Sequence, residues 1–558
     1  MVDIHDRESC GVGRRGIPAA IDTRALSEWA SRASGALAKG PAPVTGIEAV
    51  QTRRANTSDW LAVAAGTLGA MMAMLDVSIV NSALPTIQGE IGASGTEGTW
   101  IATSFIVAEI VIIPLAGWLQ RLLGLRNFLI ISTIGFIAFS MVCGMAPNLT
   151  VMILGRIGQG ITGGALIPTA MTIIATRLPR HQQPVGNSLF GATAILGPLM
   201  GPILGGWLTE NMSWHYAFFL NLPVGIALLI LLFAAMPYER PRFDLIGEAD
   251  WLGVFGMILG LGGLTVVLEE GEREQWFESA AIVWLTVTAV AGFAMLLAGQ
   301  IFARRPVIRL RLLLDRQFGA VFIMAMMIGM VIYGTSYVIP QFLSLIAHYN
   351  ALQSGQIVLL SGIPMVLMMP FMPWAIRNVP IHVSVLFGLL LLTMSAYLET
   401  TLTAASTGSD FVDSQLMRGV GTICVMMFLN QAAIRSVPTS LASDAAGLYN
   451  AARNLGGSFA LAGIAVVQDQ RLWLHSRRME ESLSANSLNV QTYLAAQARG
   501  LGGHDAALRV MEQTIQTQAL TMTFIDLFWM LIIGVACTAP LVIFLRPLPQ
   551  HAAPVAAH

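Results

Sequence analysis

The sequence contains only one lysine, Lys39, and little charge of either sign. Charged residues make up 11% of the 558 residues and hydrophobic residues make up 55%, whereas a water-soluble domain carries roughly 25% charged residues. A water-soluble fold cannot keep so many apolar side chains away from its surface. We therefore expect most of the chain to lie in a lipid bilayer.

The scarcity of lysine also excludes an ATP-binding P-loop in this chain. A P-loop needs a lysine followed by serine or threonine to bind the nucleotide phosphates, but Lys39 is followed by glycine. No haem, zinc or flavin pattern occurs, so we predict no cofactor, no metal, no enzymatic activity and no nucleic-acid partner. The four cysteines show no paired or metal-ligand spacing, which argues against a redox framework: Cys10, Cys143, Cys424 and Cys537.

Long apolar stretches are what the sequence has in abundance. A membrane-spanning helix needs about 20 mostly apolar residues. Six stretches, then two, then six more meet this length: 60–82, 98–119, 127–146, 149–176, 185–208 and 215–236; 247–268 and 281–303; 317–346, 354–374, 381–401, 412–435, 443–467 and 521–545. A chain of this kind with scattered buried acids and no ATP site indicates a secondary transporter, which binds substrate and ions between its bundles.

Arginines in the short loops predict the orientation, because cytoplasmic loops are basic. Arg53 and Arg54 precede the first stretch, and alternate loops after it carry further arginines: Arg121, Arg126, Arg177, Arg180, Arg240, Arg242, Arg304, Arg305, Arg309, Arg311, Arg316, Arg377 and Arg435. The intervening short loops contain one arginine, Arg273, among five glutamates. This pattern predicts both termini in the cytoplasm and an outward-facing segment at 469–520.

The predicted spans and loops divide the chain into five parts. They are a cytoplasmic tail (1–58), a first six-helix bundle (59–236), two inserted helices with linkers (237–316), a second bundle (317–548) and a short cytoplasmic tail (549–558).

Three charged residues fall inside the predicted spans of the first bundle. A charge near the bilayer centre costs about 2.5–3.5 kcal/mol or more, so we expect a charged residue at that depth to have a function. Asp76 and Arg156 lie at comparable depths, and Glu109 lies near mid-depth. A neighbouring arginine favours the charged carboxylate while burial disfavours it, as a protonation switch requires. The alternative is a static ion pair that fixes helix packing.

Three further charged residues lie in the second half of the chain. Arg418 repeats the Arg156 pattern in the fourth span of the second bundle, and Arg453 lies in the next span. We expect both to fix helix packing or to bind backbone carbonyls. Asp444 lies near a cytoplasmic helix end, where a cap or a loop contact is the expectation.

The fifth stretch reads GATAILGPLMGPILGGWL. Its glycines recur every four residues, which lets another helix approach closely, and its prolines bend a helix and free carbonyls. The alternative is that these glycines serve only the packing of this helix against another. The residues of interest are Gly197, Pro198, Gly201, Pro202, Gly205 and Gly206.

Four segments together resemble the major facilitator superfamily, and in particular its fourteen-span drug:proton antiporters of the EmrB/QacA type, over about 58–548. They are LDVSIVNSALP (75–85), GRIGQG with the following IP (155–168), ILGPLMGPILGG (195–206) and WHYAFFLNLPVG (214–225). The resemblance implies an all-α membrane protein of two six-helix bundles with two inserted peripheral helices. It implies proton coupling through Asp76, Arg156 and Gln159, and export rather than uptake.

The resemblance also implies partners and a location. EmrB-type permeases sit in the bacterial inner membrane and work with a periplasmic adaptor and an outer-membrane channel. The segment 469–520 either contacts such an adaptor or packs over the bundle. The substrate is then a lipophilic small molecule, exported by alternating access against protons.

The chain departs from the family at two places. The loop after the second span, GWLQRLLGLRNFL (117–129), has Arg121 where the superfamily usually has aspartate, so the resemblance does not predict its gating salt bridges. The candidate cytoplasmic gate is Gly117, Arg121, Gly124 and Arg126. Glu109 replaces a neutral polar residue and favours a cationic substrate, whereas EmrB-type pumps are associated with lipophilic weak acids, so the substrate charge stays open.

We expect a largely apolar substrate cavity that includes Trp100, Phe105, Tyr333 and Tyr337. Two other functions fit the sequence. One is a dedicated exporter of a single metabolite or siderophore; the other is a non-transporting membrane scaffold or sensor.

Overall fold

The computed structural model describes residues 54–545, except 248, 304–305, 439–440, 484–486 and 502. In this part of the chain all regular structure is helical and no strand occurs. The predicted tails, 1–58 and 549–558, lie outside the described residues apart from 54–58. The expected all-α class is confirmed.

Among the described residues, 12 helices are long and apolar enough to cross a membrane. They coincide with all the predicted stretches except 185–208 and 443–467. Long helices occupy these two places as well, namely α9 (Gln183–Asn211) and α21 (Ala442–Ser482). That both of them cross the membrane stays a prediction.

The first bundle follows the predicted order of spans. The fourth and sixth spans are each broken into two helices, at 164–165 and at Leu220. Besides α9, its helices are α3 (Thr57–Ile91), α4 (Gly95–Gly98), α5 (Trp100–Leu123), α6 (Leu125–Gly144), α7 (Leu149–Gly163), α8 (Leu166–Arg177), α10 (His215–Phe219) and α11 (Asn221–Ala235). Asparagine begins α7: the Asn148 side chain accepts a hydrogen bond from the Val151 amide at 3.0 Å, as an N-cap does.

The second bundle begins at α15, where Asp315 accepts hydrogen bonds from the Gln317 and Phe318 amides, both at 3.0 Å. Its second span is broken into short helices around prolines. Besides α21, its elements are α15 (Arg316–Leu345), α16 (Ala351–Leu359), α17 (Gly362–Met368), η3 (Met369–Phe371), α18 (Met372–Asn378), α19 (Ile381–Leu398), η4 (Glu399–Thr401), η5 (Gly408–Phe411), α20 (Val412–Arg435), α22 (Leu488–Leu501), α23 (His504–Thr538) and η7 (Ala539–Phe544).

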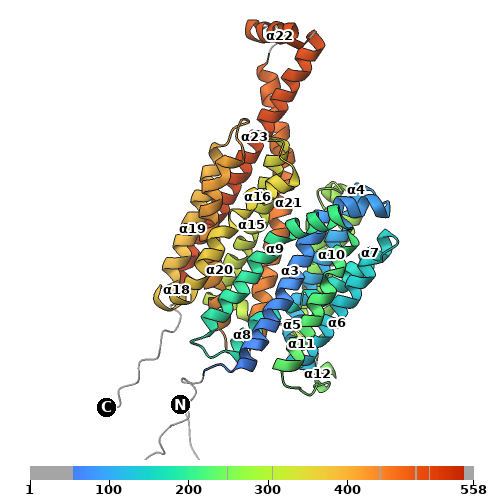
Figure 1. The fold of residues 1–558 in the computed structure, drawn as a ribbon, viewed down its shortest axis with the longest axis vertical. Helices are drawn as coiled ribbons and strands as arrows, with labels where there is room; N and C mark the ends of the chain where they lie inside the picture. Colours follow the sequence, from blue (N-terminus) through green and yellow to red (C-terminus); the bar gives the residue numbers. More distant parts are fainter. Residues whose placement is uncertain are drawn as a thin grey trace, which may run out of the picture. The chain divides into compact units, whose positions relative to one another are not determined.

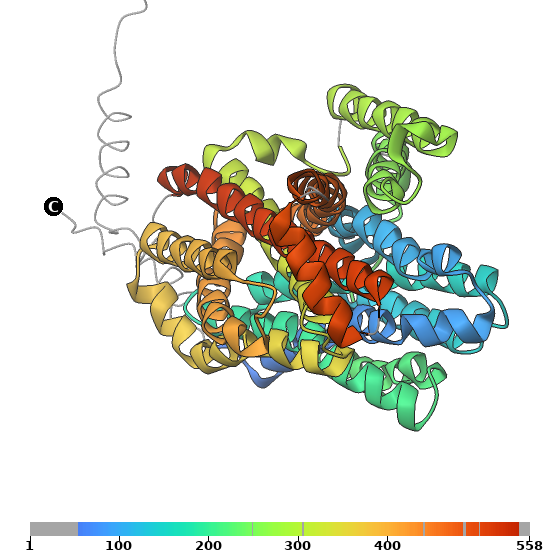
Figure 2. The same cartoon turned by 90° about the horizontal axis from the view of Figure 1, so that it is seen from above.

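The inserted segment forms a tight helical hairpin at the edge of the bundles (Figure 2). A Cβ atom on Gly256 would lie 2.4 Å from the Leu296 nitrogen, and one on Gly292 would lie 2.3 Å from the Gly260 nitrogen. The two backbones therefore touch, as small residues permit between membrane helices. The elements are α12 (Asp244–Gly247), α13 (Trp251–Glu270), η1 (Trp276–Glu278), α14 (Ala280–Phe302) and η2 (Leu310–Leu314).

We call the end at which α3 begins the inner end, after the predicted orientation. At the opposite, outer end, α21 and α23 continue past the other helices and carry α22 (Figure 1). The segment 469–520, predicted to face outward, is thus largely helical where it is described: α21 ends at Ser482, α22 follows, and α23 begins at His504.

Candidate functional site

A fully buried ion pair lies within the first bundle. Asp76 of α3 and Arg156 of α7 are both 0% exposed, and the Arg156 Nη1 atom lies 2.6 Å from Asp76 Oδ2. The second carboxylate oxygen, Oδ1, accepts hydrogen bonds from Asn221 Nδ2 at 2.7 Å and from Gln159 Nε2 at 3.1 Å. Three donors from two other helices therefore hold the aspartate of α3 in place.

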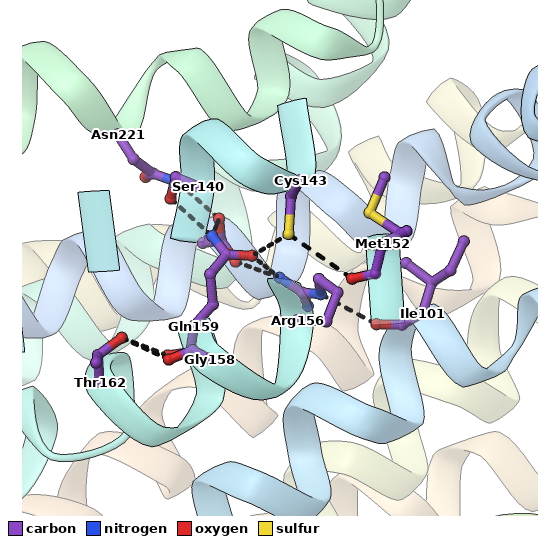
Figure 3. A network of polar contacts seen from close by, with 10 residues as sticks. Ile101, Ser140, Cys143, Met152, Arg156, Gly158, Gln159, Thr162 and Asn221 are labelled. Carbon is purple, nitrogen blue, oxygen red and sulfur yellow. Dashed lines mark hydrogen bonds and ion pairs between the residues drawn. The ribbon is translucent and has the colours of Figure 1, made fainter. Parts of the chain in front are cut away.

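Other side chains fix these donors in turn (Figure 3). Ser140 Oγ accepts hydrogen bonds from Gln159 at 2.7 Å and from Asn221 at 3.1 Å. Cys143 Sγ lies 3.3 Å from the Gln159 oxygen, which also accepts from Arg156 Nη1 at 3.1 Å. Helices α3, α6, α7 and α11 thus meet in one polar network inside an apolar bundle.

Arg156 also ties this network to α5. Its Nε donates to the Ile101 carbonyl at 3.0 Å, and its guanidinium lies 4.3 Å from the centre of the Phe105 ring. Phe105 is 1% exposed, so the structure places it beneath the arginine within the first bundle. A cation over an aromatic face is favourable, and more so when desolvated.

Glu109 lies elsewhere on α5, where it packs against α7 and faces α21. A Cβ atom on Gly164 would lie 2.8 Å from Glu109 Cγ. The charged and amide groups that act on Glu109 come chiefly from Arg453 and Asn454 of α21, with a smaller contribution from Arg156. The two acids proposed for proton coupling therefore occupy different environments, one inside the bundle and one at the boundary between bundles.

Two of the proposed cavity aromatics lie on α15. Tyr333 and Tyr337 are each 40% exposed, although they fall within a predicted span, and Tyr333 packs against Gly457 of α21. Trp100 is partly buried at the start of α5. Among the described residues, no group of three or more histidine, cysteine, aspartate or glutamate side chains is placed to hold a metal ion.

The predicted gate loop forms a contact between the bundles at the inner end. Arg121 of α5 lies 2.7 Å from the carboxylate of Asp444 at the start of α21. Next to it, Ser443 Oγ donates to the Gln120 oxygen at 3.0 Å. Asp444 is 2% exposed, and the loop contact expected for it is made with Arg121 of the predicted gate loop and with Arg309 at 4.0 Å. Arg121, which stands where the superfamily usually has aspartate, therefore has its ion-pair partner in the second bundle.

The other gate residues shape the same end. A Cβ atom on Gly117 would lie 2.5 Å from the Asp444 carboxylate, so the ion pair leaves room for glycine alone. Gly124 has φ 80°, which favours glycine, where the chain turns from α5 into α6. Arg126 lies 5.3 Å from the centre of the Phe233 ring of α11.

The glycine stripe of α9 packs directly on α3. Cβ atoms added to Gly197, Gly201 and Gly205 would lie 2.8 Å from Met74 Cβ, 2.2 Å from Ser78 Cβ and 2.8 Å from the Ile79 carbonyl oxygen, respectively. Gly206 has open space around it. Pro198 and Pro202 lie within the continuous helix. The stripe therefore holds α9 against the segment of α3 that carries Asp76.

This contact makes a matched prediction for two neighbouring glycines. We expect Gly201→Ala to destabilise the protein by about 1–3 kcal/mol, because the added methyl group overpacks the α3–α9 contact. Gly206→Ala should be neutral or slightly stabilising, since alanine favours helix by about 1 kcal/mol over glycine. Thermal unfolding of both purified variants checks this, and equal midpoints would contradict the packing described for the stripe.

A second buried ion pair lies near the outer end of the second bundle. Arg418 of α20 pairs closely with Glu399, which follows α19 and is 1% exposed. The Ser414 hydroxyl donates to the same carboxylate oxygen at 2.8 Å. The packing role expected for Arg418 thus has a specific partner that the sequence did not indicate.

We expect Glu399→Gln to destabilise the protein by about 3–5 kcal/mol, because it leaves the Arg418 charge buried without compensation. The double variant Glu399→Gln/Arg418→Met removes both charges and should regain most of that loss. Chemical or thermal unfolding in detergent measures both. If the double variant is as unstable as the single one, the uncompensated charge is not the cause.

The residues missed by sequence reasoning share one property. Asn221, Ser140 and Glu399 act through partners on other helices, and spacing along the chain does not show such pairs. Asn221 alone carried a signal, because it is the polar residue within the quoted segment WHYAFFLNLPVG.

The chain matches known proteins over most of its length. The profile of the Major Facilitator Superfamily matches residues 66–461. Colistin resistance protein EmrB from Acinetobacter baumannii is 32% identical over 491 residues, which cover 87% of this chain and 96% of that protein. Multidrug export protein EmrB from Escherichia coli K12 is 29% identical over 468 residues, with 83% and 91% covered. Fatty acid resistance protein FarB from Neisseria gonorrhoeae is 28% identical over 472 residues, with 84% and 92% covered.

Solved structures agree in fold. The human organic anion transporter MFSD10 superposes with a TM-score of 0.56 at 14% identity, covering 86% of this chain and 99% of that one. The proton:xylose symporter XylE gives a TM-score of 0.54, also at 14% identity, with 86% and 95% covered. The chain belongs to the major facilitator superfamily of membrane transporters, in which it resembles the EmrB-type drug export permeases.

Proposed function

We propose that this protein is a proton-coupled antiporter that exports lipophilic compounds across the bacterial inner membrane by alternating access. The observation that carries the proposal is the buried pair of Asp76 and Arg156. A bundle that needed only stability would gain from replacing such a pair by apolar residues. A carboxylate retained inside the membrane is most simply explained by a change in its charge during the cycle.

The proposed step begins when a proton reaches Asp76 from the outer side. Asp76 follows 19 residues after Thr57 in α3, which places it about 28 Å from the inner end of that helix. Protonation removes the charge that attracts Arg156 Nη1, and the neutral carboxyl needs fewer of its three donors. Arg156 then loosens its hold on the Ile101 carbonyl and shifts α5.

Helix α5 is the element that carries this change to the second bundle. It holds Ile101 near its outer end, Glu109 next to Arg453, and Arg121 against Asp444 at its inner end. The closed inner end corresponds to the outward-facing state, in which protons load from outside. Movement of α5 relative to α21 then opens the inner end to substrate.

The relatives support the substrate class of the proposal. The names of the relatives include multidrug export, colistin resistance and fatty acid resistance, so lipophilic compounds of either charge fit the family. The outward hairpin of α21, α22 and α23 exposes apolar side chains, Trp473, Leu488 and Tyr493 among them. We propose that this hairpin contacts a periplasmic adaptor of a tripartite efflux system.

Transport by the purified protein in liposomes tests the proposal. An imposed pH gradient should drive uptake of a lipophilic cation or a lipophilic weak acid, and nigericin, which collapses the gradient, should abolish it. Uptake that continues after collapse would contradict proton coupling. No uptake of either probe would favour a dedicated exporter or a scaffold.

A further inference from the structure

Two adjacent carboxylates at the outer end of α13 bind different bundles. Glu269 Oε1 accepts a hydrogen bond from Ser458 Oγ of α21 at 2.7 Å. Glu270 Oε1 accepts one from Thr103 Oγ1 of α5 at 2.9 Å. The inserted helix is therefore bonded to the second bundle by one residue and to the first bundle by the next.

These bonds lie in protected surroundings. Ser458, Thr103 and Glu270 are 2%, 5% and 3% exposed. Arg273 holds Glu270 from the loop that follows, with Nη1 2.8 Å from Glu270 Oε2, and the same Nη1 donates to the Thr99 hydroxyl. A hydrogen bond to a buried carboxylate is costly to leave unmade, so the two contacts strongly favour this position of α13.

The hairpin of α13 and α14 is stiff enough to transmit such contacts. Its two backbones touch at Gly256 and Gly292, as described above. On its other side, a Cβ atom on Gly262 would make ordinary contact with Val111 and Val107 of α5, at 3.5 and 3.7 Å. The hairpin is therefore one closely packed unit that also contacts α5.

The two ends of α5 and α21 are joined in different ways. At the inner end they touch directly, through Arg121 and Asp444 and through Gly447, where a Cβ atom would lie 3.0 Å from the Ile113 oxygen. At the outer end both are bonded to α13. Rocking of the bundles that opens the inner end brings the outer halves of α5 and α21 together, which changes the spacing that the two bonds to α13 fix in this structure.

We propose that Glu269 and Glu270 are positioning residues that clasp α13 between α5 and α21 and so stabilise the state with the closed inner end. The inserted pair is then a working part of the transport cycle, whereas the family resemblance implied a peripheral addition. This inference rests on the alternating-access part of the proposed function and not on proton coupling.

Distances between spin labels test the clasp. Pro147 and Ala405 are exposed in outer loops of the first and second bundles, and Cys10 and Cys537 can be replaced by serine because the other two cysteines are buried. Double electron–electron resonance on the full-length labelled protein then reports how far apart the outer ends lie. We compare Glu269→Ala, Ser458→Ala and the double variant, each in the Pro147→Cys/Ala405→Cys background.

Each single variant should lower the ratio of long to short distances about three- to tenfold, the effect of one typical net hydrogen bond. The double variant should shift it no further, because both changes remove the same bond. Glu269→Gln should restore most of the long distance, since the amide oxygen still accepts from Ser458. Glu278 is exposed in the connection between α13 and α14. Glu278→Ala is therefore the matched control and should leave the distance distribution unchanged.

Distributions identical to wild type in both single variants would overturn the clasp, as would additive shifts in the double variant. Ser458→Ala is a small change and keeps the test valid if Glu269→Ala folds poorly. Failure of the clasp would leave gradient-driven uptake by the wild type untouched, whereas failure of proton coupling alone would leave the distance shifts untouched.

Discussion

Asp76→Asn is expected to abolish transport driven by a pH gradient while substrate exchange at equal pH continues. Asparagine matches aspartate in size and still accepts hydrogen bonds from Gln159 and Asn221, but it cannot gain or lose a proton. Coupling should therefore fall at least tenfold, and the pH dependence of substrate affinity should disappear. Uptake into liposomes with and without an imposed gradient measures both effects.

The same substitution leaves Arg156 buried without a counter-charge, which costs about 3–5 kcal/mol. Lower thermal stability is thus expected beside the loss of coupling, and exchange activity shows that the variant is folded. Asn221→Ala is the control, because it removes one hydrogen bond to Asp76 and keeps the ion pair. It should retain coupling at an altered rate. Gradient-driven uptake by Asp76→Asn at the wild-type level would transfer the coupling role to Glu109.

Asp444→Arg should open the inner end. The substitution places two arginines next to each other where Arg121 now meets a carboxylate at 2.7 Å, with Arg309 4.0 Å away on the other carboxylate oxygen. Loss of a hydrogen bond between charged groups costs about 1.5–3 kcal/mol, which corresponds to a shift of roughly 10- to 150-fold toward the inward-facing state. The side chain of Arg121 is 31% exposed, so the lower half of that range is expected.

Charge exchange separates the ion pair from a simple packing defect. Arg121→Asp/Asp444→Arg restores opposite charges and should return the equilibrium most of the way to wild type. Amide hydrogen exchange at the start of α21 and the end of α5 reports the opening. Exchange should be slow in wild type, fast in the single variant and slow again in the double variant. Fast exchange in the double variant would show that the orientation of the pair, and not its charge, closes the inner end.

The sequence predicted much of the fold because its strongest signal is local. Apolar runs of about 20 residues and alternating arginine-bearing loops located the helices, and the structure places helices at every predicted span. Helix ends were less predictable. The 41-residue helix α21 continues through a polar region whose composition indicated a connection, because packing against α23 stabilises helix where the local composition is neutral.

The sequence predicted the membrane depth of the site residues but not the side chains that they contact. The spacing placed Asp76 and Arg156 at one level, and the structure joins them. The sequence predicted Phe105 as a residue of the substrate cavity, and only the path of α7 reveals that Arg156 covers it. Glu269 and Glu270 read as members of an acidic loop, because contacts to α5 and α21 depend on how three helices meet.

The measurement that tests the account most directly is proton release on substrate binding to the purified protein in detergent. A lipophilic cation and a lipophilic weak acid are added in turn to wild type and to Asp76→Asn in weakly buffered solution, with a pH indicator. The account predicts release from wild type with at least one of the two compounds and none from the variant. Binding to wild type without any release of protons would contradict it.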